Sequence, residues 1–185
     1  MSEHKPDRPS IEVLAFARQE GRLDGTWHVS ELPRLSAGLF ELDADTGASW
    51  QLAGHQQPVL GGEAAVWLHL QGRAEVVLQC QRCLQGVTTP LEIERRFRFV
   101  RTEAEAARLD EESEDDVLVL PQRLDVLELL EDEFILSLPI VPRHDVCPAP
   151  LRLIDAEDTQ QADSAPHPFA ALAFLRGGKP PEETK

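Results

Sequence analysis

Two pairs of residues with metal-binding side chains stand far apart in the sequence. Cys80 and Cys83 form a Cys-x-x-Cys pair, and His144 and Cys147 form a second pair with the same spacing. Thiolate sulfurs and imidazole nitrogens are the usual ligands of structural zinc, and one short turn commonly supplies two of them. If the fold brings the two pairs together, they predict a Cys3His zinc site. The residues alone also allow a plainer interpretation, in which the first pair ends a strand and the second lies in an ordinary loop.

A redox function of the Cys-x-x-Cys pair is a further alternative, but no strand–helix–strand pattern of the thioredoxin type surrounds it. The three cysteines cannot all pair within one chain, which excludes a disulfide-bonded scaffold. The sequence also lacks GxGxxG, phosphate-loop and HExxH motifs and any Ser/His/Asp order. We therefore expect no enzymatic activity, no catalytic residues and no small-molecule substrate. A ribonuclease would need a convergent acid–base set that this sequence does not offer.

Three consecutive acids, Glu131, Asp132 and Glu133, lie on a predicted helix. Consecutive residues point in different directions around a helix, so these carboxylates do not converge on a single catalytic site. We predict instead an acidic edge that faces water and a binding partner.

Arginines dominate a predicted strand just before the acidic half of the chain. Arg95 falls on the apolar face of this strand, so we expect it to pair with an acid inside the protein. Arg96 and Arg98 fall on the polar face and are candidates for a local contact with RNA. The neighbouring Phe97 and Phe99 face the other way, which favours a core and a separate charged surface over an aromatic platform that stacks bases.

The formal net charge of the 185-residue chain is −15 and is unevenly distributed. Residues 1–101 carry 11 basic and 13 acidic side chains, whereas residues 102–185 carry 7 basic and 20 acidic ones. Eight of these acids stand within residues 102–116, where the one basic residue is Arg108. Broad non-specific binding of nucleic acid or of anionic membrane needs a cationic surface, and this composition argues against both.

Hydropathy patterning predicts an α+β fold built on a long hairpin. Apolar and polar residues alternate over 64–80 and again over 91–101, as in antiparallel strands with one buried face. Gly72, in the middle of the first strand, predicts a bulge or bend. The clearest helix covers 125–138, with Asp125 as its N-cap. We therefore expect an antiparallel sheet packed by this amphipathic helix.

Weaker patterns predict the other elements. These are an extended segment over 11–18, a short helix over 30–36, strands over 48–53 and 117–120, and an acidic loop over 102–116.

A short apolar segment, Phe169–Leu175, stands near the end of the chain, and Pro168 and Gly177 frame it as a short C-terminal helix. The segment is too short to span a bilayer, so we expect it to dock, with Phe169 and Leu172 as candidate partner contacts. The first residues lack the apolar core of a signal peptide, and we expect a cytoplasmic protein without a membrane segment. The predicted boundaries are a disordered tail over 1–10, a single α+β domain over 11–154, a linker over 155–166, a docking helix over 167–177 and a disordered tail over 178–185.

Three blocks of the sequence resemble one known family. They are LQCQRCLQ (Leu78–Gln85), LDVLELLEDEFILSLPIVPRH (Leu124–His144) and HPFAALAFLRGGK (His167–Lys179). Their order and spacing are similar to the YceD family of large ribosomal RNA subunit accumulation proteins, and the middle block is the most specific. His167 departs from the Asn that usually begins the last block, and Cys147 stands alone where some members carry a fuller cysteine set.

The resemblance implies a cytoplasmic role in the synthesis, processing or stability of 23S ribosomal RNA, without catalytic residues. The partner is then either a ribosomal RNA precursor, contacted locally by arginines, or a basic ribosomal protein or assembly factor, held by the acidic half. The acidic excess is larger than the basic patch, so we favour the basic protein. The alternative function is a zinc-binding or redox regulatory module centred on Cys80 and Cys83.

Overall fold

The computed structural model describes residues 8–43, 45–113 and 115–148. The predictions for the first seven residues, for the linker and for the C-terminal helix, including Phe169 and Leu172, concern residues outside these ranges. Among the described residues, no helix has the length and apolar character needed to cross a membrane.

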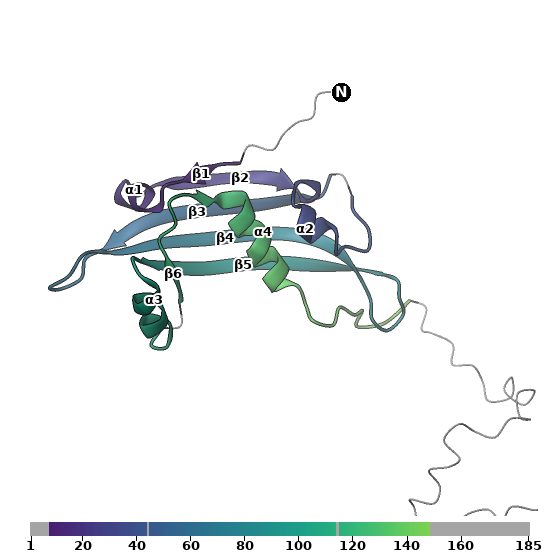
Figure 1. Cartoon of the computed structure of the whole chain (residues 1–185). Coiled ribbons are helices and arrows are strands. Elements are labelled where there is room, and N and C mark those ends of the chain that lie inside the picture. Colours follow the sequence, from purple (N-terminus) through teal and green to yellow (C-terminus); the bar gives the residue numbers. More distant parts are fainter. Residues whose placement is uncertain (1–7, 44, 114, 149–185) are drawn as a thin grey trace, which may run out of the picture. The chain divides into compact units, whose positions relative to one another are not determined.

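The fold is an α+β arrangement in which one five-stranded sheet carries the helices, as predicted (Figure 1). Its strands, in spatial order, are β2 (Arg22–His28), β3 (Gly47–Gln57), β4 (Ala65–Gln79), β5 (Gly86–Val100) and β6 (Asp116–Val119). All neighbours are antiparallel except β5 and β6, which are parallel. A separate two-stranded ladder joins β1 (Ser10–Ile11) to β7 (Leu124–Asp125), so Ser10 is ordered although it falls in the predicted tail. The helices are α1 (Val13–Arg18), α2 (Pro33–Ser36), α3 (Glu103–Asp110) and α4 (Val126–Ser137), with a 3-10 turn over Val29–Glu31.

The long hairpin of β4 and β5 is the centre of the sheet, and it has the alternation that the sequence predicts. The inward residues of both strands are buried, among them Leu68, Leu70 and Phe97, whereas their neighbours face outward. Pairing runs without interruption from Val66 opposite Phe99 to the last pair before the turn. This register leaves a six-residue knuckle, residues 80–85, at one end of the sheet, outside both strands, and that knuckle carries the cysteines.

Helix α4 crosses the inner face of β4 and β5 (Figure 1). Asp125 caps it as predicted, because its Oδ1 accepts hydrogen bonds from the backbone amides of Leu127 (2.9 Å) and Glu128 (3.1 Å). Leu130 and Phe134 are fully buried against the sheet. Gly72 lies directly beneath them.

The predicted bulge at Gly72 is wrong. Gly72 stays in register between Trp50 of β3 and Ile93 of β5. A Cβ at this position would stand 3.1 Å from Leu130 Cδ1 and 3.2 Å from Phe134 Cζ. The glycine therefore permits α4 to approach the sheet closely.

Three elements differ from the expectations. Within the segment over 11–18, Ile11 is extended in β1, but Val13–Arg18 form helix α1, because the Glu12 carboxylate accepts hydrogen bonds from the amides of Leu14 and Ala15 and caps the helix. The acidic segment after β5 contains helix α3, capped by the Thr102 hydroxyl. Strand β2 was not expected, although Leu23, Gly25 and Trp27 are less exposed than their neighbours and alternate with polar residues.

The short helix expected over 30–36 is split between the 3-10 turn and α2. Ser30 was the expected N-cap, but Leu32 occupies the cap position of α2 and makes no side-chain cap hydrogen bond. The cap is supplied from α4, as described below.

Candidate metal centre

The turn between β4 and β5 is a tight knuckle that holds Cys80 and Cys83. The Cys80 amide donates to the carbonyl of Gln85 (2.9 Å), and the Leu84 amide donates back to the carbonyl of Cys80 (2.9 Å). Leu84 adopts a left-handed backbone with φ of 61°, which is unfavourable for a branched residue and lets the chain reverse within the knuckle. Both cysteines are buried.

The segment that follows α4 runs past this knuckle and brings the second pair to it. The Gln81 amide donates to the carbonyl of Pro142 (2.9 Å). The Arg82 guanidinium donates through Nη2 to the carbonyls of His144 (3.0 Å) and Asp145 (3.1 Å). Residues separated by more than sixty positions in the chain therefore face each other across a few ångströms.

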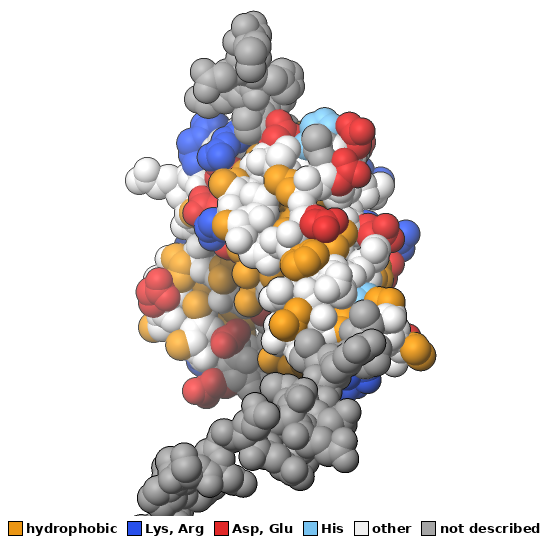
Figure 2. Space-filling model, turned by 90° about the vertical axis from the view of Figure 1, so that its right-hand side faces the viewer, with side chains coloured by type: hydrophobic (Ala, Val, Ile, Leu, Met, Phe, Trp, Pro, Cys, Tyr) orange, Lys and Arg blue, Asp and Glu red, His pale blue; other side chains and the backbone are white. Residues whose placement is uncertain are grey.

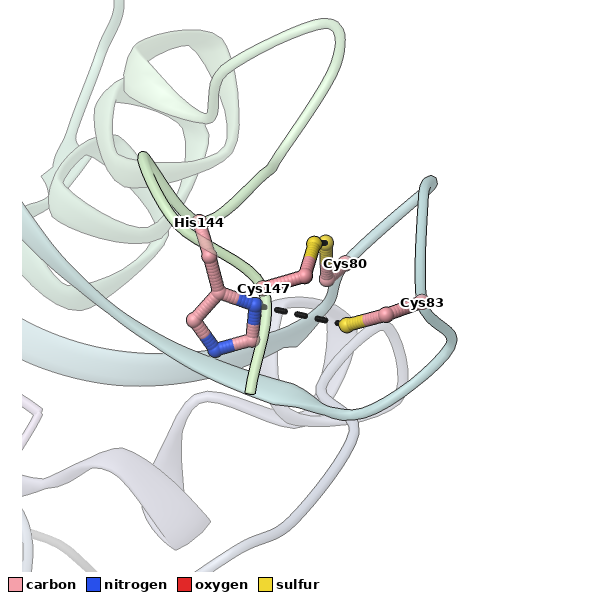
Figure 3. A group of neighbouring side chains, drawn as sticks. All are labelled: Cys80, Cys83, His144 and Cys147. Atoms are coloured by element: carbon pink, nitrogen blue, oxygen red, sulfur yellow. Dashed lines mark hydrogen bonds between the residues drawn. The ribbon is translucent and has the colours of Figure 1, made fainter. Parts of the chain in front are cut away.

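Figure 3 shows the four side chains of the two pairs converging from these two segments. Cys80 Sγ lies 3.9 Å from Cys147 Sγ, and Cys83 Sγ lies 3.5 Å from His144 Nδ1. The four donor atoms all lie within 4.8 Å of one another. The plainer interpretation, in which the pairs are unrelated, does not hold for this fold. We call these four residues the Cys3His cluster.

The three cysteines are free thiols in this structure, and the knuckle alters their acidity. Burial opposes ionisation of Cys80, but the backbone amides of His144, Arg82 and Cys83 outweigh it and lower its pKa to about 5. The Gln85 amide favours the Cys83 thiolate, but burial and the sulfurs of Cys147 and Cys80 outweigh that amide and raise the pKa of Cys83. A thiolate at Cys80 is the form that binds metal.

Arg82 is a residue that the spacing of the pairs does not point to. Its Nε donates to Cys147 Sγ (3.0 Å), in addition to the two carbonyl contacts of its Nη2. Cys147 raises the pKa of Arg82, so the guanidinium stays charged beside the sulfurs. An arginine between two cysteines is a weak sequence signal, and its role depends on a partner 65 residues away.

The predicted arginine face lies on the outward side of β5. Arg95 is half exposed, but its Nε donates to Oε2 of the buried Glu133 (3.0 Å), so the expected pair with an acid is present. Arg96 and Arg98 lie outward, with their guanidinium carbons 5.8 Å and 5.9 Å from the centre of the Trp67 ring, within cation–π range. Trp67, on β4, was not among the predicted site residues, although it stands on the polar parity of its strand.

Arg96 is not a free cation. Its Nε and Nη2 both donate to Asp115 Oδ1, at 2.8 Å and 2.6 Å, and Asp115 comes from the acidic segment before β6. That segment therefore screens part of the arginine face.

Comparison with known proteins agrees with the three sequence blocks. Residues 68–176 match the family described as "Large ribosomal RNA subunit accumulation protein YceD". The chain belongs to the YceD family. A protein of Haemophilus influenzae named "Large ribosomal RNA subunit accumulation protein YceD" is 28% identical over 167 residues, which cover 84% of this chain and 88% of that protein. No solved structure matches the chain.

The family name describes accumulation of the large ribosomal RNA subunit and no chemical reaction. Membership of the YceD family therefore connects this protein with large-subunit ribosomal RNA.

The three acids of α4 in this YceD protein do not form the predicted partner-facing edge. Glu131 is buried, and its Oε1 accepts hydrogen bonds from the backbone amides of Arg34 (2.6 Å) and Leu35 (3.2 Å) at the start of α2. Its Oε2 accepts from the Arg34 side chain (2.9 Å). Glu133 is also buried, beside Arg95. The assignment of Glu131 and Glu133 to a partner surface is wrong, because both carboxylates bind groups within the chain.

Asp132 differs from its two neighbours. Its side chain is half exposed and forms an ion pair with Arg34 Nη1 at the surface. Its assignment as a partner contact stays a prediction. The three residues do point in three directions, as expected for consecutive positions on a helix.

Proposed function

We propose that this protein supports accumulation of large-subunit ribosomal RNA in the cytoplasm by binding, without catalysing a reaction, and that it binds a basic ribosomal protein or assembly factor. The observation that carries this proposal is the charge of the element between β5 and β6. Helix α3 and the turn after it present Glu103, Asp110, Glu111 and Glu112 to solvent. The basic residue of this helix is Arg108, whose Nη1 lies 3.7 Å from Glu112 Oε2, and both side chains are exposed.

The fold supports this surface because α3 is held from below rather than through its acids. Ala106 packs with Val100 and Val117 in a small second core beside the main one. The Thr102 cap fixes the first turn of the helix. The carboxylates are therefore left for solvent or for a partner, while the helix itself is anchored by apolar contacts.

A cationic partner would be steered to this surface by long-range attraction. The chain carries a net charge of −15, and opposite charge raises association rates by roughly 10–1000-fold at low salt. The Debye length falls to about 8 Å at physiological ionic strength, so the effect weakens as salt is added. We expect a fast and salt-sensitive association.

Direct contact with a ribosomal RNA precursor is the second candidate. It is favoured by one observation, the placement of Arg98 over the outward-facing ring of Trp67. A base could stack there, since aromatic and arginine side chains are the usual platforms for single strands. The neighbouring Arg96 is neutralised by Asp115, and Glu92 and Glu94 lie on the same face of β5, so the local positive charge is small.

The experiment is a charge reversal with matched controls. Glu103, Glu111 and Glu112 are replaced together by lysine, and the control replaces the equally exposed Asp24, Glu41 and Glu75 by lysine, which changes the net charge by the same amount. A tagged full-length chain is used to capture partners from growing cells, with proteins and RNA both identified, and 23S ribosomal RNA is quantified in the same cells.

We expect the α3 reversal to lose a basic protein partner and to lower 23S ribosomal RNA, while the control triple variant keeps both. A third variant, Trp67→Ala with Arg98→Ala, tests the RNA candidate. If that variant abolishes function while the α3 reversal is silent, binding of a basic protein by α3 is refuted and direct RNA contact is the better account.

A further inference from the structure

We propose that the Cys3His cluster binds one zinc ion, that Arg82 compensates the charge of the loaded site, and that the ion fastens the segment 139–148 to the β4–β5 knuckle. This inference is independent of the partner proposed above.

The spacing of the donor atoms matches a tetrahedral zinc site. Zinc lies about 2.3 Å from sulfur and about 2.1 Å from nitrogen, so a regular tetrahedron separates two sulfurs by about 3.8 Å and a sulfur from a nitrogen by about 3.6 Å. The corresponding separations are 3.9 Å between Cys80 Sγ and Cys147 Sγ, and 3.5 Å between Cys83 Sγ and His144 Nδ1. All pairs of donor atoms lie within 4.8 Å, so no separation exceeds the tetrahedral value by more than about 1 Å.

The chemistry of the donors selects the class of metal. Three sulfurs and one imidazole form a soft set that suits zinc and excludes magnesium and calcium, which require oxygen ligands. Four protein ligands fill a tetrahedral shell, and Cys80 and Cys83 are buried. A filled shell has no open position for a substrate, so the site is structural.

Arg82 has the position of an outer residue that stabilises this ion. Three thiolates and a neutral imidazole around a divalent ion carry a net charge of about −1, and one guanidinium in contact with the shell restores neutrality. Arg82 Nε contacts Cys147 Sγ at 3.0 Å, and its Nη2 holds the backbone of His144 and Asp145. The same side chain thus offsets charge and orients both downstream ligands, and we assign it as a positioning residue.

The segment 139–148 needs such a fastening because apolar burial does not supply it. It contains no helix or strand, and three of its apolar side chains, Ile140, Val141 and Val146, are 100%, 58% and 85% exposed. Figure 2 looks onto this end of the molecule, where apolar side chains reach the surface between charged ones. The segment contacts the knuckle through the hydrogen bond from the Gln81 amide to the Pro142 carbonyl, through the hydrogen bonds of Arg82, and through the Cys3His cluster itself.

The first experiment measures metal on the full-length chain, purified under reducing conditions without chelator. We expect close to one zinc per chain by elemental analysis, and cobalt substitution should give the absorption bands of a tetrahedral thiolate site. Cys147→Ser and His144→Ala should each reduce zinc to well below half occupancy, while His55→Ala, an exposed histidine on β3, should keep it. Their thermal melts should show that all three variants remain folded, since the core lies elsewhere.

Arg82→Ala should keep the stoichiometry but weaken zinc affinity by about 10–100-fold in a chelator competition, as for other outer-shell residues. Arg108→Ala is the control for loss of an exposed arginine. Hydrogen exchange gives the readout of fastening: removal of zinc should deprotect the Gln81 amide, which donates to the carbonyl of Pro142, and the rest of 80–85, while β4 keeps its protection.

Absence of zinc from the reduced wild type, or iron in its place, overturns the assignment of the ion. Folded Cys147→Ser and His144→Ala variants with full zinc occupancy overturn the four-ligand site. An Arg82→Ala affinity equal to that of Arg108→Ala refutes the role of Arg82, and unchanged exchange of the Gln81 amide on zinc removal refutes the fastening. None of these readouts depends on ribosomal RNA.

Discussion

Replacement of Glu131 by glutamine should destabilise the protein far more than its conservative chemistry suggests. The carboxylate is 3% exposed, and it accepts three hydrogen bonds, from the amides of Arg34 and Leu35 and from the Arg34 side chain. Glutamine offers the amides of Arg34 and Leu35 only an uncharged carbonyl oxygen, which makes weaker hydrogen bonds than the carboxylate does. Its NH2 group then faces Arg34 Nε, so two donors meet where a donor and an acceptor met before.

The magnitude follows from these contacts. A hydrogen bond to a charged group contributes about 1.5–3 kcal/mol, and breaking a fully buried ion pair costs about 3–5 kcal/mol. Arg34 is half exposed and recovers part of its hydration, so the lower part of this range applies. We expect Glu131→Gln to lower the free energy of unfolding by about 2–3 kcal/mol, or roughly 5–10 °C in Tm for a chain of this size.

The assay is thermal and urea unfolding of the full-length protein, with Asp132→Asn as the matched control. Asp132 contacts the same arginine from the surface, where an ion pair contributes about 0–1 kcal/mol. Hydrogen exchange at the amides of Arg34 and Leu35 should accelerate in Glu131→Gln and stay unchanged in Asp132→Asn. A Tm loss for Glu131→Gln no larger than that of Asp132→Asn would refute the buried cap as a source of stability.

Two further outcomes follow from the packing of α4. Gly72→Ala should cost about 1–3 kcal/mol in urea unfolding, because its Cβ would press on Leu130 and Phe134, whereas Gly62→Ala, with its nearest neighbour at 3.8 Å, should change stability little; equal losses would contradict the close approach. Burial raises the pKa of Glu133, although Arg95 opposes this shift. Because the folded pKa lies above the unfolded one, the free energy of unfolding of the wild type should fall, relative to that of Glu133→Gln, as the pH rises from about 4 towards 7. A stability difference between the two proteins that does not change over this pH range would contradict the prediction.

Local patterns were sufficient for the elements whose stability is local or periodic. The β4–β5 hairpin has one buried and one solvated face, so its alternation is visible in the sequence and agrees with the register of the sheet. Helix α4 has its own cap in Asp125 and an apolar stripe. The internal pairing of Arg95 was also predictable, because a charge on an apolar face requires a partner. The middle family block contains α4, and the first block lies at the turn between β4 and β5.

The remaining features depend on contacts between distant residues. Helix α2 is four residues long and is capped by Glu131 from another helix, a contact that spans 97 positions. For this reason, Glu131 looked like a surface acid. Helix α3 was expected as an acidic loop, although its residues are mostly good helix formers and Thr102 offers a local N-cap. Burial of Ala106 against Val100 and Val117 is the part of its stability that only the fold supplies.

The Cys3His cluster combines both kinds of information. The Cys-x-x-Cys and His-x-x-Cys spacings identify the candidate ligands, since each pair must lie within one turn to share an ion. Whether two such pairs meet depends on the length of β4 and β5 and on the direction in which the chain leaves α4. That direction is set by Gly72, which lets α4 lie flat on the sheet, and by Arg82, which holds the returning backbone. Spacing within a pair is a local property of the sequence, whereas distance between pairs is a consequence of packing, and packing is decided by the whole fold.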